Sequence, residues 1–172
     1  MNNGKIVKLL RAAAKVMGIG IVVVPSMICA AGFLLYLDLS GYLFHPDYEI
    51  LTRAVRICCV PVAVFAIAMW GAAAFGSRLI DSVLEDRLVT TGIYSVVRNP
   101  IYVAVALLSS ATVVFVSGNI FLFILLPVYW ILISLLVKHT EEKALTAKFK
   151  NSYVEYCKRV NRCIPWFPKK EK

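Results

Sequence analysis

The chain has 172 residues, of which 60% are hydrophobic, and a mean hydropathy of +0.76. Soluble domains are about 45–50% apolar, so a soluble fold of this size would leave large apolar patches in water. The net charge of +9 is divided among the segments between apolar runs, which argues against a nucleic-acid-binding protein and for a membrane protein. One domain is expected at this length.

Four apolar stretches predict an all-α fold of four transmembrane helices. A helix needs roughly 20 residues to cross a hydrocarbon core of about 30 Å. The first two stretches are long enough alone, whereas the last two are shorter and flank a tight turn at Ser117-Gly118-Asn119, which predicts a helical hairpin. The predicted spans are residues 16–37, 54–75, 101–116 and 120–137.

The basic residues predict the orientation of these spans. Four precede the first span, three lie between the second and third, and ten follow the fourth, so that seventeen of the nineteen fall on one side. Arg53 and Arg56 lie on the other side. The positive-inside rule therefore predicts cytoplasmic N- and C-termini, in a cell inner membrane or the endoplasmic reticulum. The first apolar run exceeds signal-peptide length without a clear cleavage site, which predicts an uncleaved anchor helix.

A polar segment before the third span ends on a predicted helix start. Asn99 is expected as the N-cap and Pro100 as the first helical residue. The amide donors and positive dipole end of this helix would face the cytosol, where they attract a carboxylate or phosphate. Arg98 adds a cation, and Tyr94 and Tyr102 add aromatic surface at the headgroup level. The alternative is that these are ordinary boundary residues that cap, snorkel and anchor.

A cytoplasmic amphipathic helix is predicted after the fourth span. Its apolar side chains recur at helical spacing and form a stripe of Leu145, Phe149, Tyr153, Tyr156 and Val160. Glu141 and Glu142 stand about one turn beyond the span, and Lys138 is placed to pair with Glu142 four residues later. The alternative is a solvated helix on the membrane surface, although such helices are normally cationic and two adjacent carboxylates are out of place there.

The order of these parts resembles the isoprenylcysteine carboxyl methyltransferase and phospholipid methyltransferase superfamily of integral membrane enzymes. The resemblance covers about residues 88–166 and rests on an ordered set of residues around a membrane hairpin. These are Gly92-x-Tyr94-x-x-x-Arg98-Asn99-Pro100-x-Tyr102 before it, and Glu141-Glu142-x-x-Leu145, Phe149, Tyr153-x-x-Tyr156 and Arg162-x-Ile164-Pro165 after it.

The resemblance implies an S-adenosylmethionine site formed by the cytoplasmic segments 76–100 and 138–172. The implied cofactor-binding residues are Tyr94, Arg98, Asn99, Tyr102, Glu141 and Glu142, with Arg98 and Glu142 also implied as catalytic. The implied substrate is a membrane lipid or a prenylated or otherwise lipidated molecule. The family often carries histidine at the position of Asn99, and an arginine one turn before the acids where this chain has Lys138.

These residue types suit methyl transfer from a sulfonium, which requires alignment and exclusion of water but no metal. Carboxylates suit the cationic groups of the cofactor, and helix-end amides with Arg98 suit its carboxylate. Carboxyl and amine acceptors both remain open. A first rival function is a non-enzymatic membrane protein that binds a lipid or a partner helix. A second is a small transporter or channel, although the spans hold few polar groups. Gly18-Ile-Gly20 and the alanine-rich second span permit oligomers.

Overall fold

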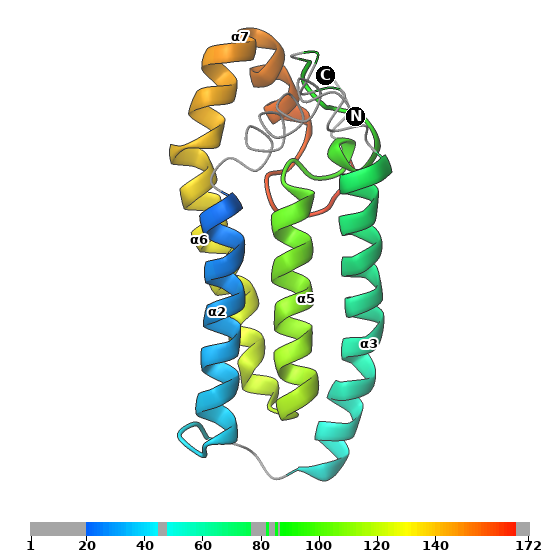
Figure 1. Cartoon of the computed structure of the whole chain (residues 1–172). Helices are drawn as coiled ribbons and strands as arrows, with labels where there is room; N and C mark the ends of the chain where they lie inside the picture. The colour runs from blue at the N-terminus through cyan, green and yellow to red at the C-terminus, as the bar shows by residue number, and fades with distance from the viewer. Residues whose placement is uncertain (1–19, 45–47, 77–81, 83–84, 86, 168–172) are drawn as a thin grey trace, which may run out of the picture.

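The computed structural model describes residues 20–44, 48–76, 82, 85 and 87–167. Figure 1 shows an elongated bundle of long helices with a further helix, α7, arching over one end. The bundle helices are α2 (Gly20–Leu39), α3 (Glu49–Gly71), α5 (Pro100–Ser117) and α6 (Leu125–His139). A π-helical turn, η1 (Ala72–Gly76), extends α3, and a 3-10 segment, η3 (Ile120–Ile124), leads into α6.

Four helices are long and apolar enough to cross a membrane, as the sequence predicted. They cover Gly20–Leu39, Glu49–Gly76, Pro100–Ser117 and Ile120–His139. The second begins earlier than the predicted residue 54, because Glu49 occupies the first turn and forms an ion pair with Arg53 one turn later. The predicted first residues of span one, 16–19, lie outside the described part of the chain.

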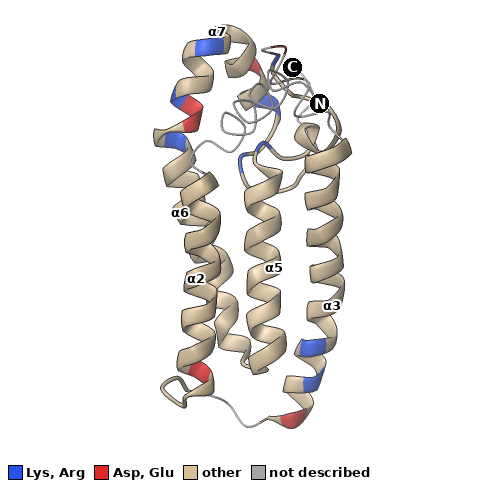
Figure 2. Ribbon diagram, in the orientation of Figure 1, with Lys and Arg blue, Asp and Glu red and all other residues tan. Residues whose placement is uncertain are grey.

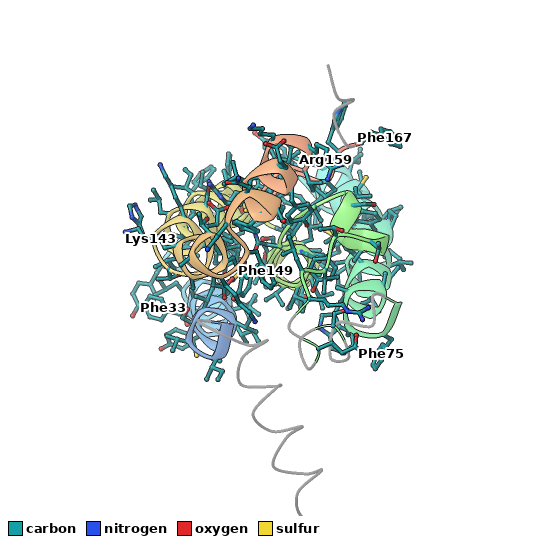
Figure 3. All side chains as sticks on the ribbon, turned by 90° about the horizontal axis from the view of Figure 1, so that it is seen from above. Phe33, Phe75, Lys143, Phe149, Arg159 and Phe167 are labelled. Carbon is teal, nitrogen blue, oxygen red and sulfur yellow. The ribbon has the colours of Figure 1, made fainter. Side chains whose placement is uncertain are left out.

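Helix α5 is the centre of the bundle. It packs against α3 on one side and against α2 and α6 on the other (Figures 1 and 3). Of its apolar window, 56% is buried within the protein, compared with 17–28% for the other three spans. Small side chains on α5 permit this close approach of three helices, and those that are buried include Ala104, Ala106, Ser110 and Ala111.

Charged residues of the described chain gather at the two ends of the bundle. In Figure 2 the middle of α2, α3, α5 and α6 carries none of the colours of Lys, Arg, Asp or Glu. Large apolar side chains are exposed along these middles, for example Phe33 and Ile67. A band of exposed apolar side chains between two charged ends is the pattern expected of helices that cross a bilayer.

The end opposite α7 is closed by polar contacts around the α5–η3 turn. Gly118 adopts a left-handed φ of 78°, which ends α5. The next residue, Asn119, is 1% exposed and donates to Asp38 at the end of α2 and to the carbonyl of Phe44. Arg56 of α3 donates to the carbonyl of Phe115. These bonds fix the ends of three helices against one another.

Helix α7 (Glu141–Arg159) is two helical segments rather than the single predicted helix. Lys150 interrupts it with φ 48° and ψ −125°, a conformation that no α-helix contains. The break lets α7 curve across the end of the bundle, with Lys143 on one side and Arg159 on the other (Figure 3). The side chains of the predicted stripe lie in one cluster, which is Leu145, Phe149, Tyr153, Tyr156 and Val160 together with Leu88 and Cys157.

Candidate functional site

The start of α5 and the first turn of α7 lie at the same end of the bundle. Asn99 occupies the N-cap position and Pro100 begins the helix, as predicted. The Asn99 side chain, however, makes no capping hydrogen bond to the helix. Its amide donates instead to the carbonyl of Arg162, at 3.1 Å. A second chain segment thus binds the N-cap residue itself.

That segment, residues 161–166, is named here the C-terminal strap. It runs beside the start of α5 (Figure 1) and is joined to residues 96–99 by backbone hydrogen bonds. The amide of Arg98 donates to the carbonyl of Asn161 at 2.9 Å, and the amide of Trp166 donates to the carbonyl of Val96 at 3.3 Å. Val97 and Asn161 form a parallel bridge. The strap therefore holds the start of α5 in a fixed position.

Glu142 is held by two arginines. Its Oε1 accepts from Arg98 Nη1 and from Arg162 Nε, each at 2.7 Å, and its Oε2 accepts from Arg162 Nη2 at 2.7 Å. The side chains of Glu142 and Arg98 are 13% and 10% exposed. Arg162 also donates from Nη1 to the hydroxyl of Ser134 in α6, at 2.8 Å. Charge-assisted bonds of this kind are among the stronger contacts in proteins.

Arg98 has one further partner and one unused donor. Its Nη1 also donates to Cys157 Sγ, in the second half of α7. Its Nε is buried and has no hydrogen-bond partner among the described residues. A buried donor without a partner costs free energy, and an anionic ligand at this position would remove that cost.

Glu141 faces a different neighbour from Glu142. Its Oε1 accepts from the phenol of Tyr102 in α5, at 2.6 Å. Gly20 of α2 lies behind that phenol, since a Cβ at Gly20 would stand 3.1 Å from the Tyr102 oxygen. The half-buried Tyr94 lies in η2 (Gly92–Ser95), and its carbonyl accepts from Tyr156. Tyr102 therefore lies beside the first turn of α7, and Tyr94 contacts the second half of that helix.

The electrostatics of the site are dominated by its acids and guanidinium groups. Burial raises the pKa of Glu142, but Arg162, Arg98 and Lys138 together outweigh it and hold that pKa below its ordinary value. Burial, and then the charge of Glu141, raise the pKa of Tyr94 to about 12. At neutral pH Glu142 is therefore ionised and Tyr94 keeps its proton.

A shallow, open depression lies beside Glu142 on the surface at the junction of α6 and α7. Lys138, Lys143, Thr146 and Ala147 complete its lining. Both lysines are exposed. Of the six candidate site residues, only Glu142 borders this depression.

Four of the six residues that the sequence singled out contact one another in two pairs, whereas Asn99 contacts the strap and the carbonyl of Tyr94 contacts Tyr156. The pairs are Arg98 with Glu142 and Tyr102 with Glu141. Sequence analysis missed the central position of Arg162 and the contacts of Ser134 and Cys157. The only available signal for Arg162 was its place in the motif Arg162-x-Ile164-Pro165.

Comparison with known proteins agrees with this arrangement of parts. The sequence pattern of the phospholipid methyltransferase family matches residues 51–152, from within α3 to within α7. No curated protein and no solved structure matches the chain. Because the family match covers more than half of the 172 residues, and four apolar helices accompany it, the protein belongs to the phospholipid methyltransferase family, within the superfamily of integral membrane methyltransferases that act on lipid.

Proposed function

We propose that the protein transfers a methyl group from S-adenosylmethionine to a lipid or lipidated acceptor at the cytoplasmic membrane face. The observation that carries this proposal is the direct contact between the start of α5 and the first turn of α7. Arg98 meets Glu142 and Tyr102 meets Glu141 at the end of the spanning helices. A water-soluble donor and a membrane-dissolved acceptor can both reach that level.

The residues of this site fit the donor. Its carboxylate suits Arg98, whose buried Nε lacks a partner among the described residues. Its amino group suits Glu141, and its planar base suits the aromatic surface of Tyr94. When bound, the donor supplies an electrophilic methyl group on a sulfonium. We assign the binding role to these side chains from their chemistry and their place at one end of the bundle.

The chain's own contribution to the reaction would be alignment and exclusion of water. Tyr102 orients the Glu141 carboxylate through the 2.6 Å bond from its phenol. An amine acceptor must lose its proton before attack, and a glutamate of the site or a water would accept that proton. For a carboxyl acceptor, Lys138 would orient the anion instead, because Arg98 is assigned to the carboxylate of the donor. The isoprenylcysteine-type and phospholipid-amine reactions therefore use the same site with different groups.

Binding of S-adenosylhomocysteine by purified protein in detergent tests the proposal. Arg98→Ala and Glu141→Gln are each expected to weaken binding by about tenfold or more, because each removes a charged hydrogen-bonding group. Isothermal titration gives the dissociation constants, and thermal unfolding shows whether each variant is folded. Arg53→Gln, an exposed cation at the opposite end, is the matched control and should bind normally.

Two results would contradict this assignment. If the wild-type protein does not bind the probe, the rival function of a non-enzymatic lipid- or helix-binding membrane protein is favoured. If folded Arg98→Ala and Glu141→Gln both bind as tightly as the wild type, the site lies elsewhere. Incubating active protein with labelled donor and membrane lipid extracts, then identifying the labelled lipid, distinguishes carboxyl from amine methylation.

A further inference from the structure

The adjacent acids of α7 differ in the charge of the groups that hold them. Tyr102, a neutral phenol, donates to Glu141, whereas two guanidinium groups donate to Glu142. Consecutive helical residues point about 100° apart, so neighbours in sequence face different groups in space. Given the proposed function, this difference in neighbours indicates which of the two glutamates is suited to contact the methyl donor.

Glu142 has little capacity left for a ligand. An ionised carboxylate offers about four acceptor positions, and three here are used by Arg98 and Arg162. The three side chains together carry two positive charges and one negative charge. A group with a net positive charge attracts an anion and repels a sulfonium or ammonium. Glu142 is therefore poorly suited to bind the cationic part of a methyl donor.

Arg162 joins three elements around this group. Its guanidinium contacts Glu142 of α7 and Ser134 of α6. Its carbonyl accepts from the backbone amide of Asn99, at the start of α5, and from the Asn99 side chain. Residue 162 lies beyond the part of the chain that the family pattern matches, which ends at residue 152.

Arg98 depends on this arrangement for its position. Its Nη1 is bound to the same Glu142 Oε1 that Arg162 Nε holds. Its side chain is 10% exposed, and its Nε is without a partner among the described residues. The Arg98 guanidinium is largely buried, is held through Nη1 and has no partner at Nε among the described residues, so it is suited to bind an anion.

We propose that Arg162 and Glu142 are positioning residues, which hold Arg98 as the binding group for the carboxylate of the methyl donor. The cationic groups of the donor then bind on the side of Glu141. This changes the role expected for Glu142 from a group that contacts ligand to a group that acts through Arg98. The inference rests on the proposed function and refines the roles of residues at that site.

A pair of probes that differ in one group tests the proposal. S-adenosylhomocysteine carries the carboxylate, whereas its decarboxylated analogue keeps the amine, thioether and nucleoside. Dissociation constants for both are measured with full-length protein in detergent, for the wild type, Arg162→Gln and the control Arg53→Gln. The wild type and the control should prefer the carboxylate-bearing probe by about tenfold to a hundredfold. Arg162→Gln should bind both probes within about threefold of each other, with wild-type affinity for the analogue.

The preference between probes separates positioning from a general structural role. If Arg162→Gln weakens both probes equally or keeps the wild-type preference, the positioning role is wrong, while wild-type binding still supports the proposed function. If the wild type binds neither probe, the proposed function fails and this inference fails with it. Should Arg162→Gln not fold, Ser134→Ala removes one hydroxyl contact of Arg162. It should lower the preference by about threefold, and an unchanged preference contradicts the proposal.

Discussion

Glu142 is a carboxylate whose ionised form the fold stabilises, and its titration gives a pH prediction. Its folded pKa lies below the ordinary value of 4.5, so its contribution to stability is complete above about 4.5 and is lost as the pH falls through the folded pKa. Glu142→Gln should lower the free energy of unfolding at pH 7 by about 1–3 kcal/mol, because it removes the charged acceptor of two partly buried guanidinium groups.

Thermal unfolding in detergent between pH 3 and pH 8 measures this effect. The gap in unfolding midpoint between wild type and Glu142→Gln should stay constant from pH 8 to about 5 and shrink at lower pH. A gap that instead grows below pH 4.5 would mean that the carboxylate is stabilised in its neutral form. The comparison with the variant subtracts the titration of the other acids.

For single residues, the sequence predicts which side chains form the site better than it predicts which groups they pair with. Arg98, Glu141 and Glu142 were identified from their place in an ordered motif. Lys138 was expected as the partner of Glu142 because four residues separate them on a helix. The ion pairs of Glu142 are instead with Arg98 and Arg162, which lie 44 and 20 residues away in sequence. Such pairs depend on tertiary packing, which helical spacing does not encode.

The end of α5 is a structural element that depends on one glycine. Gly118 has a φ of 78°, and a Cβ there would stand 2.5 Å from the methyl group of Thr52. Gly118→Ala should destabilise the protein by about 2 kcal/mol, since residues with a side chain are strained in this backbone conformation and the added methyl overlaps Thr52 of α3. Differential scanning of the purified variant in detergent gives the change in midpoint.

Two further variants separate these causes. Gly71→Ala, at a helical glycine with no atom within 4 Å of the added Cβ, should be neutral or slightly stabilising. Thr52→Ser in the Gly118→Ala background removes the overlapping methyl and should recover part of the loss. If Gly118→Ala is as stable as Gly71→Ala, the turn does not constrain the α5–η3 connection.

Helices were predicted correctly where one feature of the sequence, such as apolar length or a helix-start pair, defines them. Apolar length located four spans, and Asn99-Pro100 located the start of α5. The break in α7 at Lys150 could not be predicted, because lysine favours helices and no glycine or proline marks the site. The strap also lacked a signal, since its bonds to residues 96–99 are backbone contacts between distant segments.

On the scale of the whole molecule, the apolar band separates two ends of different character. The end with α7 holds the candidate site, the C-terminal strap and the shallow depression beside Glu142. The opposite end holds Asp38, Asn119 and the α5–η3 turn. The lysines and arginines within residues 1–19 and 168–172 lie outside the described part of the chain. The position of the site at one end means that orientation decides whether a cytosolic donor can reach it.

Orientation can be measured by labelling introduced cysteines with a membrane-impermeant maleimide. Tyr42→Cys lies at the end opposite α7 and Ser152→Cys lies in α7, and both positions are exposed. Because the positive-inside rule predicts a cytosolic α7 end, Ser152→Cys should be labelled in sealed vesicles whose cytosolic face is outward, and Tyr42→Cys only after permeabilisation. The unmodified chain, with its five cysteines, gives the background. If Ser152→Cys is protected in those vesicles until they are permeabilised, the site faces away from the cytosol, where S-adenosylmethionine made in the cytosol could not reach it without transport.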